Sequence, residues 1–194
     1  MIIVITPEIY CANEIYLVNE LLKSGIDLLH IRKFNLQDME VMEYVDSIEA
    51  EYRNKLVLHS HRHLANILGI NRVHIREADR KNGIHLKFKK NKILSTSTHS
   101  INEFNKLEPF WDYAFLSPLL PSISKPNYGI SSTVLSQIKF RTNQEVKLIG
   151  LGGIKKGNVN KIIKEHIDGF ALLGAIWNNP NPGEYLDFAK NINY

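Results

Sequence analysis

Cysteine is nearly absent from this chain, and so are long hydrophobic runs. The single cysteine, Cys11, has no intramolecular partner, so a disulfide-stapled fold is excluded and a reducing compartment is expected. No apolar run reaches the roughly 18 residues of a membrane-spanning helix. The apolar stretch from Met1 to Pro7 lacks the basic region that precedes a signal-peptide core. We therefore expect a cytoplasmic protein that makes no contact with a membrane.

A large charge of one sign is also absent. The chain has 24 Lys and Arg against 20 Asp and Glu, a net charge of +4, which suits small anionic substrates better than a long nucleic-acid backbone. With 44% hydrophobic and 23% charged residues, the composition excludes disorder and low complexity. We expect one domain over residues 1–194 and no nucleic-acid partner.

Eight short apolar runs recur along the chain. Most are apolar at every position rather than at alternate ones, which is typical of strands buried on both faces of a parallel sheet. The predicted strands are Ile2–Ile5, Leu28–Ile31, Leu56–Leu58, Arg72–Ile75, Lys92–Thr96, Tyr113–Leu116, Val146–Gly150 and Gly169–Leu173. Their regular spacing predicts repeated strand–helix units.

Amphipathic segments between these runs predict the helices, which are Glu14–Lys23, Leu36–Glu51, His61–Leu68, Ile101–Leu107, Ser131–Ile138, Lys155–Lys164 and Pro182–Asn191. Asn35 is expected to cap the second helix, and Gly25 to end the first in the left-handed conformation. The segment Asp79–Lys90 contains Gly83 and alternates apolar with polar residues, so the fourth helix is expected to be missing or irregular. We predict an α/β fold, a compact (β/α)8 TIM barrel with a degenerate fourth helix, ahead of an open doubly wound sheet.

Polar residues follow most of the predicted strands, at the barrel end where active sites of this fold form. They include His30, Arg32, His59, Ser60, His61, His74, Arg76, Ser97, His99, Ser117, Gly152, Gly153 and Gly174. A single histidine is more often structural, but four strand ends in succession carry one. This pattern predicts a functional site at the carboxyl end of the barrel.

Five segments resemble, in the same order, the thiamin phosphate synthase and TenI family, barrels that act on phosphorylated thiamin precursors. Asp27–Arg32 is similar to the second strand with its His-x-Arg ending, and Ser97–Ser100 to the fifth-strand Ser-x-His element. The stretch Asp112–Lys125 resembles the sixth strand and its loop, with Ser in place of each Thr and Ser117 in place of Gly. Leu148–Ile154 resembles the Gly-Gly-Ile turn, and Asp168–Ile176 the eighth strand.

The resemblance implies a phosphate site, and the residue types agree with it. A phosphate needs several donors around it, which hydroxyls, an ammonium group and backbone amides can supply. The expected phosphate-binding residues are Ser122, Ser124, Lys125, Gly152, Gly153 and Gly174. Further substrate contacts are expected from His30, Arg32, His59 and Ser97.

Two reactions of the family are open, and departures from its pattern favour one. The resemblance implies that a synthase holds Mg²⁺ on a third-strand Asn-Asp and a later Asp. Here the pair is His59-Ser60, and only Asp79 is left as a carboxylate ligand. The Arg-Glu-Lys of the second strand is also replaced, by Arg32-Lys33-Phe34, so the distal lysine is lost or displaced.

We therefore favour a TenI-like thiazole tautomerase, an isomerase that aromatises a dihydrothiazole carboxylate phosphate and requires no cofactor. His99 is the expected acid/base group, because imidazole can both accept and donate a proton near neutral pH. The alternative is a thiamin phosphate synthase, a transferase (pyrophosphorylase) that condenses hydroxymethylpyrimidine pyrophosphate with thiazole phosphate and uses Mg²⁺, with Asp79 as a ligand.

Two function classes outside the family are also compatible with the sequence. His59-x-His61-x-His63 has the alternation of a metal-ligand run, as in a metal-dependent hydrolase, although carboxylates are scarce around it. A non-catalytic sensor of a phosphorylated ligand would keep the phosphate pocket without turnover. The resemblance also makes a homodimer plausible.

Overall fold

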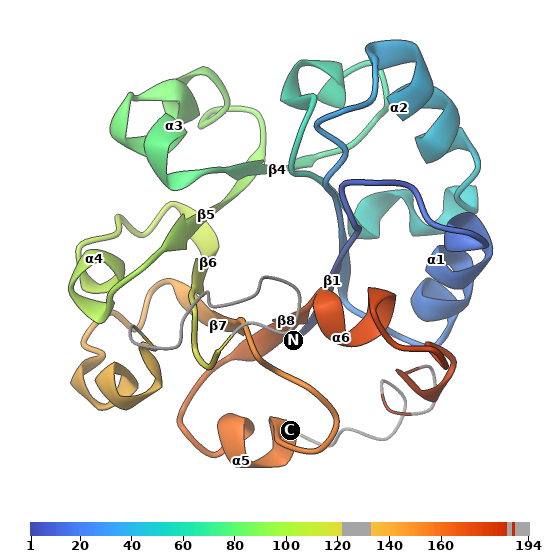
Figure 1. Cartoon of the computed structure of the whole chain (residues 1–194). Helices are drawn as coiled ribbons and strands as arrows, with labels where there is room; N and C mark the ends of the chain where they lie inside the picture. Colours follow the sequence, from blue (N-terminus) through green and yellow to red (C-terminus); the bar gives the residue numbers. More distant parts are fainter. Residues whose placement is uncertain (122–132, 186–187, 189–194) are drawn as a thin grey trace.

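The structure is a computed structural model and describes residues 1–121, 133–185 and 188. Eight parallel strands form a closed barrel in sequence order, and the last strand pairs with the first. They are β1 Ile2–Ile5, β2 Leu28–Ile31, β3 Leu56–Leu58, β4 Arg72–Ile75, β5 Ile93–Thr98, β6 Trp111–Leu116, β7 Lys147–Leu151 and β8 Gly169–Leu172. Figure 1 shows the strands as an inner ring with the helices outside it. The predicted TIM barrel is confirmed, and the open sheet is excluded.

The first helix has the predicted bounds, and most of the other helices are shorter than predicted. The α-helices are α1 Glu14–Lys23, α2 Asp38–Asp46, α3 Glu77–Lys81, α4 Ile101–Asn105, α5 Val159–Ile163 and α6 Gly174–Trp177, and the 3₁₀ helices are η1 Ala50–Lys55, η2 Arg62–Ala65, η3 Ile84–Lys87 and η4 Leu135–Phe140. The fourth repeat is irregular as predicted, although the short helix α3 remains in it. The predicted helices Ser131–Ile138 and Pro182–Asn191 lie partly outside the described residues.

Of the two helix ends predicted from the sequence, one is confirmed and one is wrong. Gly25 has φ +102° and ends α1 as predicted. The prediction for Asn35 was wrong, because α2 begins after Gln37, whose backbone N–H donates to the Glu40 carboxylate at 2.7 Å. That contact belongs to a capping box, and it places the start of α2 after residue 37.

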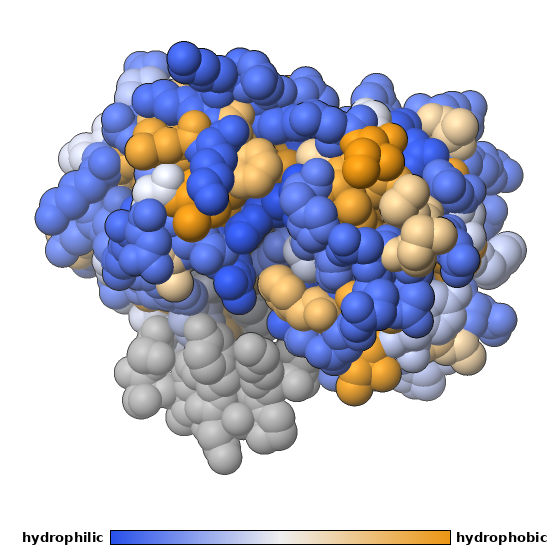
Figure 2. Space-filling view, turned by 90° about the horizontal axis from the view of Figure 1, so that it is seen from above, coloured by the Kyte–Doolittle hydropathy of each residue, from blue (hydrophilic) through white to orange (hydrophobic). Residues whose placement is uncertain are grey.

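Two apolar cores result from the alternation of side chains along the strands. The barrel interior holds Ile3, Ile5, Leu28, Val57, Tyr113, Phe115, Ile149 and Ala171, and a larger core lies between the barrel and the helices. In the part of the chain that the structure describes, no helix is long and apolar enough to cross a membrane. Figure 2 shows hydrophobic residues in separate patches among hydrophilic ones on one face.

The amino-terminal end of the barrel is closed by charged side chains. Asp112 on β6 accepts hydrogen bonds from Arg72 on β4 at 2.7 Å and from Lys147 on β7 at 2.9 Å. These three charges, at the amino-terminal ends of β4, β6 and β7, are thus paired with one another.

Candidate functional site

Three histidines from successive strands meet inside the carboxyl end of the barrel. His30 lies on β2, His74 lies on β4, and His59 follows β3. The rings of His59 and His74 are 4.1 Å apart between centroids, and that of His30 lies 5.5 and 5.3 Å from them. His30 and His74 are fully buried, and His59 is 9% exposed. His30 and His59 each lie two residues after an inward-facing residue, Leu28 and Val57, so alternation along the strand directs them to the same side.

A buried hydrogen-bond network holds these rings. His30 Nδ1 lies 3.3 Å from His59 Nδ1, and His30 Nε2 lies 2.5 Å from the Tyr113 hydroxyl. His74 Nδ1 and Nε2 each lie 3.0 Å from a serine hydroxyl, those of Ser95 and Ser97 respectively. The predicted substrate contact Ser97 is therefore a partner of His74.

The three rings are neutral at physiological pH. Burial lowers the pKa of His30 and His59 well below the ordinary value for histidine, and neighbouring histidines and arginines lower them further. Burial, together with Arg62 and Arg76, lowers the pKa of His74 to about 3. Uncharged imidazoles can accept hydrogen bonds or bind a metal ion.

Three arginines, Arg32, Arg62 and Arg76, lie near the histidine cluster. Arg32 is paired with Glu8 at 2.8 Å. Arg80 donates to Thr96 Oγ1 and the Ser97 carbonyl, and it has no carboxylate partner among the described residues. The rim also carries Phe34, whose ring lies 5.4 Å from the Arg32 guanidinium and 6.1 Å from the His59 ring. Such a mouth attracts anions.

The residues left for a family-type Mg²⁺ site do not fit that role. Asp79 accepts hydrogen bonds from Arg62 at 2.8 Å and from Arg76 at 3.1 Å. Burial alone would raise its pKa, but these two guanidinium groups hold it below its ordinary value. The Ser60 hydroxyl accepts from the Lys33 backbone at 3.0 Å. A carboxylate shared by two arginines beside a bound hydroxyl is a poor substitute for the paired carboxylates of a magnesium site.

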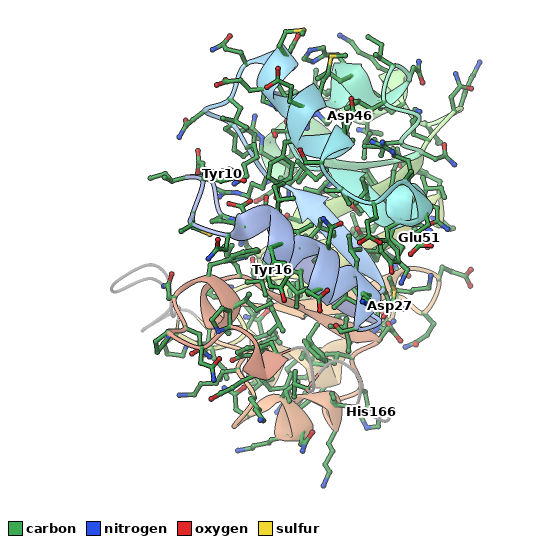
Figure 3. All side chains as sticks on the ribbon, turned by 90° about the vertical axis from the view of Figure 1, so that its right-hand side faces the viewer. Tyr10, Tyr16, Asp27, Asp46, Glu51 and His166 are labelled. Atoms are coloured by element: carbon green, nitrogen blue, oxygen red, sulfur yellow. The ribbon has the colours of Figure 1, made fainter. Side chains whose placement is uncertain are left out.

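Lys33 is not a displaced phosphate-binding lysine. Its side chain is fully buried and lies 2.7 Å from Glu14, which also accepts a 2.6 Å hydrogen bond from the Tyr44 hydroxyl. This cluster joins the end of β2 to α1 and α2. Figure 3 shows α1 running along this side of the molecule, from near Tyr10 towards Asp27. The distal lysine of the family pattern is therefore lost from the mouth.

His99 stands apart from the histidine cluster. It follows β5, its side chain is 45% exposed, and its Nδ1 lies 2.9 Å from the Ser117 carbonyl. A carbonyl only accepts, so Nδ1 carries the proton and Nε2 faces Glu77 at 3.4 Å. His99 thus lies beside the start of the predicted phosphate loop, between the Ser117 carbonyl and the Glu77 carboxylate.

The predicted phosphate loop is described only at its start, because Ser122, Ser124 and Lys125 lie outside the described residues. Before them, the Leu120 backbone N–H donates to the Gly152 carbonyl at 3.2 Å. Gly152 and Gly153 have φ of +101° and +69°, so both sit where side chains are strained. The turn at Gly152–Gly153 therefore lies beside the chain that precedes the predicted loop, and the loop's own contacts stay a prediction.

Gly174, the other predicted phosphate contact, is buried at the start of α6. The indole of Trp177 in the same helix donates to the Ile5 carbonyl at 2.7 Å. That bond fixes α6 against the end of β1, at the carboxyl end of the barrel.

The alternating histidine run does not form a metal site. His61 contacts the Ser60 hydroxyl and the Leu36 carbonyl, and His63 contacts Asp38 at 2.8 Å. Only His59 of the run points into the barrel. Sequence reading noted His74 but did not include it in the site, and it missed Tyr113. The alternation of inward and outward positions along β4 and β6 was the signal that could have found them.

Comparisons with known proteins agree with this architecture. The profile of the family described as thiamine monophosphate synthase matches residues 2–176. The thiamine-phosphate synthase of Alkaliphilus oremlandii is 25% identical over 179 residues, 89% of this chain and 85% of that protein. That of Pelagibacter ubique is 28% identical over 177 residues, 89% of this chain and 84% of that protein.

Solved structures are similar over nearly the whole chain. The thiamine phosphate pyrophosphorylase of Pyrococcus furiosus has a TM-score of 0.80 at 19% identity, and that of Bacteroides thetaiotaomicron 0.77 at 22%. Each covers 97% of this chain and 93% of the other. At such identities, the likeness shows the fold alone.

Proposed function

The chain belongs to the thiamine monophosphate synthase family, and we propose that it is a transferase that joins a pyrimidine pyrophosphate to a thiazole phosphate. The names of its relatives favour this reaction over the isomerisation that the sequence pattern favoured. The structural observation that carries the proposal is the group of three arginines, Arg32, Arg62 and Arg76, near the histidines at the carboxyl end of the barrel, which suits a pyrophosphate leaving group.

The charges at the mouth favour a polyanion. The three guanidinium groups of Arg32, Arg62 and Arg76 are matched by two carboxylates, because Arg62 and Arg76 share Asp79 and Arg32 is paired with Glu8. Positive charge therefore exceeds negative in this set. Guanidinium groups bind phosphate oxygens in a bidentate manner, so we propose that they neutralise the pyrophosphate in the role that Mg²⁺ fills elsewhere in the family.

The phosphate of the second substrate requires its own donors. We assign it to Ser122, Ser124 and Lys125, with the turn at Gly152–Gly153 and the start of α6 at Gly174. The pairing of Leu120 with Gly152 supports this arrangement, because it brings the chain before Ser122 alongside the turn.

A thiazole tautomerase is the second candidate, and one observation favours it. His99 has a defined tautomer, with Nδ1 bound to the Ser117 carbonyl and Nε2 facing the carboxylate of Glu77. An imidazole held in this way can remove a proton from a ring carbon and return one elsewhere.

Product analysis separates the candidates. The chain is incubated with pyrimidine pyrophosphate plus thiazole phosphate, and separately with the dihydrothiazole carboxylate phosphate, each with and without Mg²⁺. We expect thiamin phosphate and pyrophosphate, with little dependence on Mg²⁺. Aromatised thiazole alone would instead establish the isomerase, and binding without turnover in either assay would establish a sensor.

A variant tests the role of Arg76 directly. Arg76→Gln should weaken binding of the pyrimidine pyrophosphate about 10- to 150-fold, which corresponds to the roughly 1.5 to 3 kcal/mol of hydrogen bonds to charged groups. Arg53→Gln is the matched control, because Arg53 also pairs with one carboxylate, Asp46, but lies outside the mouth. Equal affinities of the two variants in calorimetry would remove Arg76 from the binding site.

A further inference from the structure

We propose that His30, His59 and His74 bind a divalent transition-metal ion of the zinc class at the floor of the mouth. Among the described residues, these three histidines are a group whose ligand nitrogens all lie within 4.8 Å of one another. They come from three successive strand positions, so the barrel itself fixes their relative placement. This inference departs from the sequence expectation that no metal is required.

The distance between two of the nitrogens fits shared coordination. His30 Nδ1 and His59 Nδ1 face each other at 3.3 Å. Two nitrogens bound tetrahedrally to zinc at about 2.0 to 2.1 Å are roughly 3.3 to 3.4 Å apart. A ring nitrogen of His74 completes a set of three whose members all lie within 4.8 Å of one another.

The outer partners are those that orient metal-bound imidazoles. When His30 binds through Nδ1, its Nε2 carries the proton and donates to the Tyr113 hydroxyl at 2.5 Å. His74 has a serine hydroxyl at each nitrogen, Ser95 at Nδ1 and Ser97 at Nε2. Whichever nitrogen binds the ion, the other keeps a hydrogen-bond partner, which is the usual second layer of a histidine metal site.

The ligand set selects the class of ion. Three neutral imidazoles suit Zn²⁺, Co²⁺, Ni²⁺ or Cu²⁺, whereas Mg²⁺ requires oxygen ligands. Arg32, Arg62 and Arg76 lie nearby, but Glu8 and Asp79 partly compensate their charge. Three protein ligands leave one position open. Because His59 is the most exposed of the three, that position faces the mouth, where an anion can balance the charge.

Metal titration tests the site without reference to catalysis. The full-length chain is stripped with a chelator and titrated with Co²⁺, whose absorption spectrum reports tetrahedral nitrogen coordination. We expect one ion per chain, displaced by Zn²⁺ and unaffected by excess Mg²⁺. If the wild-type chain binds no Co²⁺, or if Mg²⁺ displaces it, the cluster is a hydrogen-bond network only and the proposal is wrong.

Variants locate the bound ion. His59→Asn should reduce Co²⁺ affinity more than Tyr113→Phe, for which loss of an outer partner predicts a decrease of about 10- to 100-fold. His63→Asn is the matched control, since His63 lies in the same histidine run but contacts Asp38. Circular dichroism verifies that each variant is folded. Should His59→Asn fail to fold, the Co²⁺ affinity of folded Tyr113→Phe, expected to be about 10- to 100-fold below that of His63→Asn, decides the question. Affinity equal to that of His63→Asn in every folded variant would overturn the assignment.

Discussion

Side-chain direction at single residues decides which strand-end groups reach the site. The even-numbered positions of β2 and β4 bring His30 and His74 inward, and alternation along a strand predicts this. Lys33, one residue further than Arg32, points to the opposite side and is buried against Glu14. Sequence could not reveal this pairing, because Glu14 belongs to a different repeat and only the packed fold brings the two charges together.

His99 provides a prediction for the isomerisation. If the chain converts the dihydrothiazole carboxylate phosphate, His99→Asn should lower the rate by about 10²- to 10⁴-fold, the usual contribution of a general acid/base group. Ligand binding should change little, as the phosphate contacts remain. His166→Asn is the control, because His166 is exposed at φ +60°, a conformation that asparagine tolerates. A His99 variant with normal turnover would exclude this role.

Glu14 provides a second prediction at this scale. Glu14→Gln leaves the buried Lys33 ammonium without its counter-charge and should lower the free energy of unfolding by about 3 to 5 kcal/mol. Urea denaturation measures the loss. Glu20→Gln is the control, since Glu20 is paired with exposed Lys23 at 4.0 Å and should cost less than about 1 kcal/mol. If both variants lose a similar free energy of unfolding, the buried ion pair of Glu14 and Lys33 contributes no more stability than an exposed pair.

Strands and helices differ in how well the sequence predicts them. Each predicted strand ends within two residues of the observed one, because a buried parallel strand is a short apolar run bounded by polar residues. Several helices were predicted too long. Periodicity cannot distinguish an α-helix from a 3₁₀ turn of similar spacing, and the segment predicted as His61–Leu68 forms only the 3₁₀ helix η2.

The turn after β7 yields a prediction at the scale of an element. Gly153 has φ +69°, and an added Cβ would lie 2.5 Å from Leu120 Cβ and 2.6 Å from the Pro121 carbonyl oxygen. Gly153→Ala should therefore destabilise the chain by more than the roughly 1 to 2 kcal/mol of left-handed strain alone. Gly157→Ala is the control, because a Cβ there meets open space. Denaturation midpoints that coincide would mean that the turn adjusts without cost.

Across the whole molecule, the two ends of the barrel carry different chemistry. At the amino-terminal end, charged side chains form ion pairs with one another, as Asp112 does with Arg72 and Lys147. The carboxyl end keeps neutral histidines and arginines around a mouth. Repeat order made the closed barrel predictable, and strand-end composition made the gathering of histidines at its carboxyl end predictable. The network inside the mouth was not, because it depends on contacts between repeats distant in sequence.

Acid unfolding tests whether the ion pairs of Asp112 with Arg72 and Lys147 stabilise the folded barrel. Burial alone would raise the pKa of Asp112, but Lys147 and Arg72 hold it below its ordinary value. As the pH falls, the unfolded chain therefore takes up this proton first, so the stabilisation is complete above about pH 5 and is lost as the pH falls below about 4.

Asp112→Asn should lower the free energy of unfolding by about 1 to 3 kcal/mol at neutral pH, with the difference from wild type shrinking below about pH 4. Asp46→Asn, which removes an exposed partner of Arg53, should change stability by less than about 0.5 kcal/mol at every pH. Urea denaturation from pH 3 to pH 8 measures the free energy of unfolding of the wild type and both variants. If the difference between Asp112→Asn and the wild type stays constant down to pH 3, the ion pairs of Asp112 do not stabilise the fold.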